Sequence, residues 1–320
     1  MVLEPALRND LVELIAANFK TDEVNELGGL ILGSFNSNEA AGTKNHISLS
    51  SRKSAKLLVD RCENGGQVPA LLKLVVEVDD GIVHGRSVRV EGLENFLGKL
   101  LRAGIRYDYK TRRIINSCRE PGELVNWGCL KEGRVYEAAV VSLDIAESSS
   151  LLRKYGLKKM ERLYFNLWGF LRDKLAATDG RIWSWAGDGG ILAFALKEGA
   201  RRAVRFAIEI QTSIPVFNLT SSTDWPTDIS LRLGIDTGKV RFMADTGKIL
   251  SDVINYAAHL EKKATPPGCI SISRAVYNML PRRLAQLFHY AGIFEDRDHF
   301  TTLRRLDGLL LDDGSEESFA

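Results

Sequence analysis

The stretch Ala138-Ala-Val-Val-Ser-Leu-Asp144 is an apolar, β-branched run that ends on an acidic residue. Further along, Trp185-Ala-Gly-Asp188-Gly-Gly-Ile-Leu-Ala-Phe194 places a second aspartate in a Gly-rich turn between two apolar segments. These patterns predict a strand ending at Asp144 and a hairpin whose turn holds Asp188. Hard cations such as Mg²⁺ take oxygen ligands, commonly one or two carboxylates together with substrate phosphates. The two stretches therefore predict a divalent cation held over a triphosphate.

Small residues around the two aspartates strengthen this interpretation, because a single Asp at a strand end is also a common turn former. Ser148 and Ser149 follow Asp144 closely and would stand at the start of the next helix, where hydroxyls and backbone N–H groups form a phosphate cradle. The glycines beside Asp188 allow the backbone to approach a substrate closely.

The composition excludes several classes of protein. The 320 residues suffice for two domains, and 45% hydrophobic with 26% charged residues is ordinary for a globular protein. The net charge of +2 is scattered, so we expect no nucleic-acid partner. Four separated cysteines without a CxxC pair predict free thiols. No apolar run reaches the roughly 20 residues that span a bilayer, and the N-terminus lacks a basic segment before an apolar one. We expect a cytoplasmic protein with no membrane association.

The chain is expected to form three parts. Residues 1–107 carry apolar residues at helical spacing and predict a small all-α bundle. No cluster of Asp, His or Cys interrupts this bundle, which favours a docking module. Residues 108–136 are expected as a linker, and residues 137–320 as an α+β domain.

Strand and helix signals alternate in the α+β domain. After the strand that ends near Asp144 we expect a helix over 151–177, a hairpin over 181–186 and 190–196, and a helix over about 198–213. There follow a strand over 229–235, a turn at 236–239, its continuation over 240–243, a helix over about 252–264 and a short strand over 269–273. This β-α-β-β-α-β order predicts a ferredoxin-like sheet covered by helices on one face.

Residues 136 to about 295 resemble the catalytic domain of the class III nucleotidyl cyclases. The resemblance rests on four motifs in order, namely Ser142-Leu-Asp-Ile-Ala-Glu-Ser-Ser149, Ala186-Gly-Asp-Gly-Gly-Ile-Leu-Ala-Phe194, Leu231-Arg-Leu-Gly-Ile-Asp-Thr-Gly-Lys-Val240 and Ser251-Asp-Val-Ile-Asn-Tyr-Ala-Ala-His-Leu-Glu261. The N-terminal bundle resembles the effector-associated, death-like domains of bacterial defence enzymes, through Leu58-Val-Asp-Arg-Cys-Glu-Asn-Gly-Gly-Gln-Val-Pro-Ala-Leu-Leu72.

The resemblance to the cyclases implies roles for individual residues. Asp144, Asp188 and the carbonyl of Ile145 match the positions that bind two divalent cations, Mn²⁺ or Mg²⁺. Asn255 matches the asparagine that orients the ribose. His259 stands where the family has its transition-state arginine, four residues further on the same helix face. The family forms its site at a dimer interface, so a homodimer is implied, with the aspartates from one subunit and Asn255 and His259 from the other.

The positions that read the base depart from the purine cyclases. Ser184 stands where adenylate cyclases carry a lysine, and Lys248 falls near the partner position, which is usually Asp or Thr. This combination is more similar to the pyrimidine cyclases of bacterial antiphage systems, which convert UTP or CTP to the second messengers cUMP or cCMP. The resemblance also implies a separate effector activated by the cyclic nucleotide and a protein partner for the N-terminal domain.

Two alternatives stay open. The same reaction on ATP or GTP would make the protein an adenylate or guanylate cyclase. A degenerate nucleotide-binding signalling module would fit the missing arginine at His259, whereas the two retained aspartates argue against it. Arg304 and Arg305 are candidates for holding the triphosphate.

Overall fold

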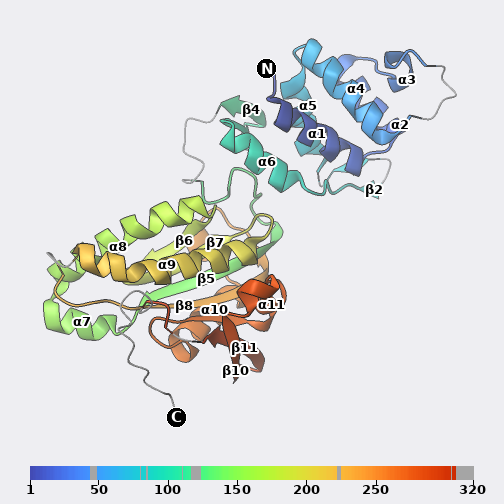
Figure 1. Cartoon of the computed structure of the whole chain (residues 1–320). Coiled ribbons are helices and arrows are strands. Elements are labelled where there is room, and N and C mark those ends of the chain that lie inside the picture. The colour runs from blue at the N-terminus through green and yellow to red at the C-terminus, as the bar shows by residue number, and fades with distance from the viewer. Residues whose placement is uncertain are drawn as a thin grey trace. The chain divides into compact units, whose positions relative to one another are not determined.

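The computed structural model describes residues 1–43, 49–79, 81–83, 86–109, 111–116, 124–221, 225–303 and 305–307. The chain divides into two compact units, Met1–Leu130 and Lys131–Ala320 (Figure 1). Each unit has its own core and is described by itself.

Helices dominate the first unit. Its helices are α1 (Pro5–Asn18), α2 (Thr21–Leu32), α3 (Ser37–Ala40), α4 (Ser51–Asn64), α5 (Val68–Val78) and α6 (Leu93–Arg102). Helix α4 begins behind Ser50, whose hydroxyl caps the Lys53 N–H, and α5 carries a proline in its first turn. Apolar side chains at helical spacing, among them Leu11, Leu58 and Leu71, are fully buried between the helices.

Two short hairpins complete the first unit, β1 (Ile82–Val83) with β2 (Arg86–Ser87) and β3 (Ile105–Asp108) with β4 (Arg113–Asn116). The second hairpin is tied to α5 through Glu77, which accepts hydrogen bonds from Tyr107 (3.1 Å) and Arg112 (3.0 Å). Trp127 is 1% exposed. The segment 108–136, expected as a linker, thus starts inside a hairpin and ends inside the strand that opens the second unit.

The second unit is an α+β fold built on one seven-stranded sheet with the order β10-β11-β9-β8-β5-β7-β6. Its strands are β5 (Val135–Ile145), β6 (Arg181–Ala186), β7 (Gly189–Phe194), β8 (Leu231–Arg241), β9 (Ile270–Ser273), β10 (Phe288–Phe294) and β11 (Arg297–Thr302). Its helices are α7 (Ser148–Tyr155), α8 (Leu157–Ala177), α9 (Gly199–Ser221), α10 (Asp252–Ala264), α11 (Arg274–Asn278) and α12 (Arg282–Ala285), with a short 3₁₀ helix η2 (Thr246–Lys248). The four strands β8-β5-β7-β6 have the ferredoxin-like order, which confirms the predicted fold.

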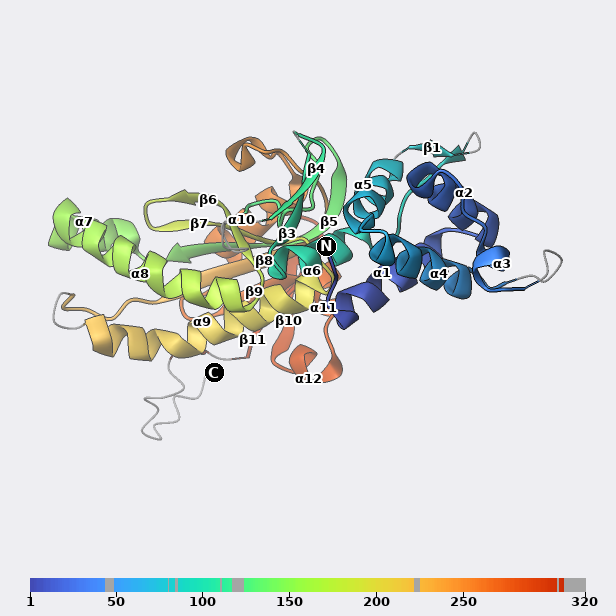
Figure 2. The ribbon, with the colours of Figure 1, turned by 90° about the horizontal axis from the view of Figure 1, so that it is seen from above.

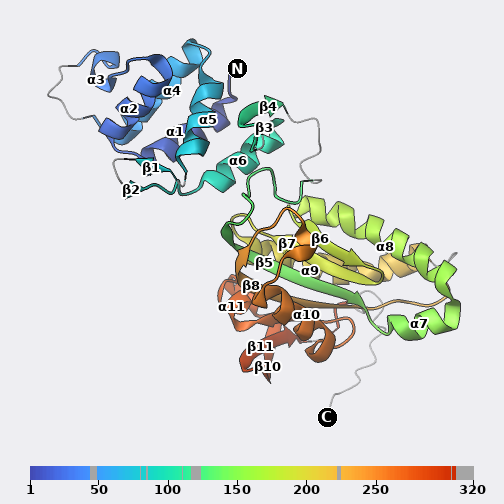
Figure 3. The ribbon, with the colours of Figure 1, turned by 180° about the vertical axis from the view of Figure 1, so that it is seen from behind.

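Alternation along β5 divides its side chains between the two faces of the sheet. Val141, Leu143 and Ile145 join α8 and α9 in the main hydrophobic core. The intervening Ser142 and Asp144 lie on the opposite face, where α10 packs against β5 and β8. Figure 2 shows α8 and α9 together on one side of the strands, and Figure 3 shows α10 on the other side.

The expectation that helices cover only one face is therefore wrong, because α10 covers part of the second face. Gly234 of β8 makes this possible, since a Cβ there would lie 2.4 Å from the Ala257 carbonyl oxygen and 2.5 Å from the Glu261 nitrogen. The missing side chain lets α10 lie directly on the strand.

Three expected elements differ in extent. The helix over 151–177 is broken at Gly156 (φ +78°) into α7 and α8. The turn at 236–239 is absent, because β8 runs unbroken from Leu231 to Arg241 and pairs with β5 along its whole length. Helix α9 continues to Ser221, through Pro215.

None of the described helices is long and apolar enough to cross a bilayer. The cysteines that the structure describes, Cys62, Cys129 and Cys269, are buried.

Candidate active site

Asp144 occupies the end of β5 and lies between two paired strands. Its register partners are Gly189 on β7 and Arg232 on β8. A Cβ on Gly189 would meet the Leu143 carbonyl oxygen at 2.3 Å and Asp144 Oδ1 at 3.0 Å. Glycine at 189 thus leaves the space beside the Asp144 carboxylate open.

Asp188 is brought to the same place by the β6–β7 turn. Gly187 adopts φ +61°, a conformation that favours glycine, and the Asp188 carbonyl accepts a hydrogen bond from Ile145 N–H (3.3 Å). Burial raises the pKa of Asp144, and the nearby Asp188 carboxylate raises it further, against the lowering effect of the Arg232 hydrogen bond. The two predicted aspartates therefore share one site.

Arg232 and Glu261 belong to this site although neither was assigned a role from the sequence. Arg232 Nη2 donates to Asp144 Oδ2 at 2.8 Å, and Arg232 Nε lies 3.1 Å from Glu261 Oε1. The second contact is an ion pair without hydrogen-bond alignment, since neither of its atoms has a hydrogen-bond partner. Both residues belong to the motifs named in the sequence analysis. The pairing of β5 with β8 places Arg232 opposite Asp144, and this pairing could have pointed to the site.

Glu261 is the most perturbed acid of the site. It is 6% exposed, and burial raises its pKa to about 7, with the Asp144 carboxylate adding to the effect and Arg232 opposing it. Three carboxylates, those of Asp144, Asp188 and Glu261, therefore lie together at this end of β5, with Arg232 and Lys262 as the opposing cations.

A cavity of about 600 Å³ opens over these groups. The predicted residues Ser148, Ser149 and Ser184 line it beside the two aspartates, and so do Arg232, Glu261 and Lys262. Ser148 and Ser149 stand at the start of α7, where the first N–H groups of a helix have no partner within the helix, and Ser184 belongs to β6. The cavity therefore combines carboxylates, cationic side chains and a helix start, which suits a phosphate ester bound with a cation.

The donor set fits a hard divalent cation. Asp144 and Asp188 offer carboxylate oxygens in an electronegative corner, and the space beside Gly189 is open to an ion. Ile145 is fully buried in the core, so only its backbone carbonyl could contribute. No group of three or more His, Cys, Asp or Glu side chains that could hold a metal occurs among the described residues. An ion here would complete its shell with water or substrate oxygens, as Mg²⁺ commonly does.

Three other predicted residues do not line this cavity. Asn255 and His259 lie on the exposed side of α10, and Lys248 lies in η2, where it pairs with Asp245 (3.0 Å). The neighbouring Thr246 hydroxyl donates to the Trp183 carbonyl (2.5 Å), which ties η2 to β6 next to Ser184. Within one chain, Asn255 and His259 thus lie outside the cavity that the aspartates line.

Of the two candidate arginines near the end of the chain, Arg304 lies outside the described residues. Arg305 is engaged elsewhere, since its Nη2 donates to Asp307 Oδ2 (2.9 Å) and to the Ser230 hydroxyl (2.7 Å). Among the described residues, the arginine that lines the cavity is Arg232.

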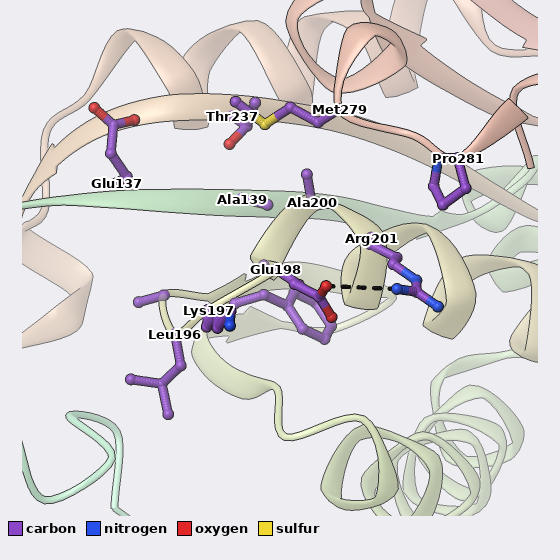
Figure 4. Close-up of a pocket in the computed structure, with 13 residues that line it drawn as sticks. Glu137, Ala139, Leu196, Lys197, Glu198, Ala200, Arg201, Thr237, Met279 and Pro281 are labelled. Carbon is purple, nitrogen blue, oxygen red and sulfur yellow. Dashed lines mark hydrogen bonds and ion pairs between the residues drawn. The ribbon is translucent and has the colours of Figure 1, made fainter. Parts of the chain in front are cut away.

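A second hollow, of about 430 Å³, lies at the opposite end of β5 (Figure 4). Its carboxylates, Glu137 and Glu198, lie apart, and Glu198 pairs with Arg201 (3.5 Å). Without converging charges, this hollow is a weaker candidate than the cavity at Asp144.

No protein-family model matches the sequence, and no curated protein matches it. Solved structures with a similar fold include the guanylyl cyclase Cya2, at 17% identity and a TM-score of 0.46, with 54% of this chain and 93% of that chain covered. The guanylate cyclase domain of RhGC from Catenaria anguillulae, in complex with GTP, is 20% identical, with a TM-score of 0.46 and coverage of 54% and 99%. The adenylate/guanylate cyclase/hydrolase from Silicibacter pomeroyi is 24% identical, with a TM-score of 0.45 and coverage of 53% and 98%.

Proposed function

We propose that the second unit is a metal-dependent nucleotide cyclase, which converts a nucleoside triphosphate to its 3′,5′-cyclic monophosphate and pyrophosphate. The observation that carries the proposal is the convergence of Asp144, Asp188 and Arg232 on one cavity beside the start of α7. Phosphoryl transfer is catalysed mostly by positioning the substrate and stabilising its charge. Carboxylates that bind metal ions and an arginine that binds phosphate supply these two functions.

In the proposed reaction the ribose 3′-hydroxyl releases its proton to water, and its oxygen bonds to the α-phosphorus while the bond from that phosphorus to the pyrophosphate oxygen breaks. Asp144, Asp188 and the Ile145 carbonyl would hold two divalent cations, Mg²⁺ or Mn²⁺. Such cations favour ionisation of the 3′-hydroxyl and stabilise the pyrophosphate that leaves. Ser148 and Ser149 would hold phosphate oxygens at the start of α7, and Arg232 would turn from Asp144 toward the triphosphate.

Asn255 and His259 are proposed to complete the site from a second copy of the chain. Both lie on an exposed face of α10, outside the cavity that their own chain forms, so a partner subunit could present them. A two-fold homodimer would then contain two equivalent sites. Asn255 would orient the ribose, and His259 would donate a hydrogen bond to a phosphate oxygen.

We propose a pyrimidine triphosphate, UTP or CTP, as the substrate. Ser184 lines the cavity with a small hydroxyl, and η2, which contains Lys248, is tied to the same strand by the Thr246–Trp183 hydrogen bond. Hydroxyl and ammonium groups can donate to the carbonyl oxygens of uracil or cytosine. The product, cUMP or cCMP, would act as a second messenger in antiphage defence through a separate effector, with the first unit as the docking module for a protein partner.

The test is a product assay on purified protein with each of the four ribonucleoside triphosphates and Mn²⁺ or Mg²⁺. Formation of cUMP or cCMP is the expected result. Dominant cAMP or cGMP would refute the pyrimidine assignment and keep the cyclase. No product from any triphosphate would refute the cyclase and leave a nucleotide-binding module.

A further inference from the structure

A histidine and a glutamate from different elements meet on the exposed side of α10. His259 Nδ1 lies 2.8 Å from Glu295 Oε1, which is hydrogen-bond distance, and Glu295 belongs to the turn between β10 and β11. Lys263, one helical turn after His259, reaches the same carboxylate oxygen at 3.6 Å. Glu295 therefore faces both side chains of α10.

The turn is fastened to the helix next to this pair. The Tyr256 hydroxyl donates to the Phe294 carbonyl (3.4 Å), and the rings of Tyr256 and Phe294 lie 6.0 Å apart. On the other side of the turn, the Arg297 guanidinium lies 4.7 Å from the centre of the Tyr256 ring. These contacts hold the two residues between Phe294 and Arg297, one of which is Glu295, beside α10.

The conformation of the turn does not itself call for glutamate. Glu295 and Asp296 have φ values of +47° and +60° in a two-residue hairpin loop, where Asn-Gly and Asp-Gly are the favoured sequences. A positive φ is uncommon for residues other than Gly, Asn and Asp and costs conformational energy. The turn conformation therefore does not explain why position 295 carries a glutamate, whereas the contact with His259 gives its side chain a partner.

We propose that Glu295 is the positioning residue for His259, an inference that rests on the proposed cyclase function. A carboxylate that accepts from Nδ1–H fixes both the tautomer and the orientation of an imidazole, as in metal and hydrolase sites. Nε2 is then the nitrogen left to face the substrate of the partner subunit, and it donates to a phosphate oxygen when the ring carries its second proton. An arginine has no such need, because its guanidinium is always charged and presents several donors.

The first test reads the tautomer and needs no activity. ¹⁵N-histidine spectra of the purified protein, with His259→Asn to assign the signal among five histidines, should show neutral His259 protonated on Nδ1. Glu295→Gln should shift the population toward the Nε2–H form, and Lys263→Ala, which removes the other neighbour of the same oxygen, should not. A neutral His259 protonated on Nε2 in the parent protein would overturn the proposal.

The second test is a double-mutant cycle on cyclase activity. Glu295→Gln should lower kcat by roughly 10- to 100-fold with little change in KM, the usual cost of losing such a partner. In a His259→Arg background the same substitution should change kcat less than about 3-fold, because the guanidinium does not depend on Glu295. An equal loss in both backgrounds would show a merely structural role and refute the proposal.

The outcomes separate the two levels of inference. An active parent whose Glu295→Gln variant is equally active would refute the positioning role alone. A parent inactive on every triphosphate would refute the cyclase, and with it a catalytic use for the pair.

Discussion

The Glu261 carboxylate is buried beside Arg232. Its environment should make the stability of the second unit depend on pH. Burial and the neighbouring aspartates raise its pKa to about 7 in the folded protein, whereas an unfolded glutamate titrates near 4.3. Between these two values the folded state binds the proton more tightly than the unfolded state. The free energy of unfolding should therefore fall as pH rises from about 4 to 7, by up to roughly 3 kcal/mol.

Glu261→Gln should remove most of this pH dependence. The measurement is denaturant unfolding at pH 5 and pH 8 with a chelator present, followed by tryptophan fluorescence, which reports mainly on the second unit because it holds Trp168, Trp183, Trp185 and Trp225. Glu161→Gln, on the exposed side of α8, is the matched control and should keep the parent slope. An unchanged slope in Glu261→Gln would contradict the assignment.

Asp188→Ala should lower the cyclase turnover by roughly 10³-fold or more, because it removes a proposed metal ligand. The fold should persist, because Asp188 adds to the negative charge that already raises the pKa of Asp144. Product formation and the thermal midpoint of the same preparations give the measurement. Asp173→Ala, at an exposed position of α8, is the control that should keep both. Normal turnover by Asp188→Ala would refute the role of Asp188 as a metal ligand.

At the scale of the elements, Gly234 sets how closely α10 approaches β8. A methyl group at this position would meet the Ala257 carbonyl oxygen at 2.4 Å and the backbone nitrogen of Glu261 at 2.5 Å, and backbone atoms cannot move aside as a flexible side chain would. Gly234→Ala should therefore destabilise the protein by about 2 to 3 kcal/mol and weaken the Arg232–Glu261 contact.

Gly169→Ala is the comparison that isolates this effect, because nothing lies within 4 Å of a Cβ there and the position is inside α8. It should stabilise the protein by about 0.5 to 1 kcal/mol through the helix propensity of alanine. Equal unfolding midpoints for the two variants would show that α10 is not held by close packing at Gly234.

The elements also show where sequence patterns suffice and where they do not. The apolar run to Asp144 and the Gly-rich turn at Asp188 are local signals, and both predicted elements are present. Asp236-Thr-Gly-Lys239 has the composition of a turn, yet it continues β8 because β5 pairs with it residue by residue. Tertiary pairing overrode the local preference, and a single sequence does not contain that pairing.

The site follows the same division. The sequence predicted Asp144, Asp188 and the serines after β5, because each functional side chain lies within a few residues of the strand or turn signal that positions it. Arg232 and Glu261 were missed because their connection to Asp144 depends on the register of β8 and on the approach of α10, and both features join distant parts of the chain. The partner of His259 comes from a hairpin turn that no motif included.

At the scale of the whole molecule, the proposed homodimer would divide each active site between two chains, because Asn255 lies outside the cavity that holds the aspartates of its own chain. If a complete site takes Asp144 and Asp188 from one subunit and Asn255 and His259 from its partner, two inactive variants can rescue each other. A mixed dimer of Asp188→Ala and Asn255→Ala copies would have one site with both defects and one intact site. Equal mixing makes about half of the dimers mixed, so activity should return to about a quarter of the parent value.

The matched control mixes Asp188→Ala with Asp144→Ala. Both defects then lie in the same half-site, each site of a mixed dimer lacks one aspartate, and no activity should return. Two affinity tags, one on each copy, report how many mixed dimers form and give the specific activity of that fraction. Mixed dimers of Asp188→Ala and Asn255→Ala that stay inactive would show that each chain works alone, and Asn255 would then have to reach the cavity of its own subunit by a movement of α10. Such a movement would have to lift α10 from the β8 backbone at Gly234 and break the Arg232–Glu261 contact.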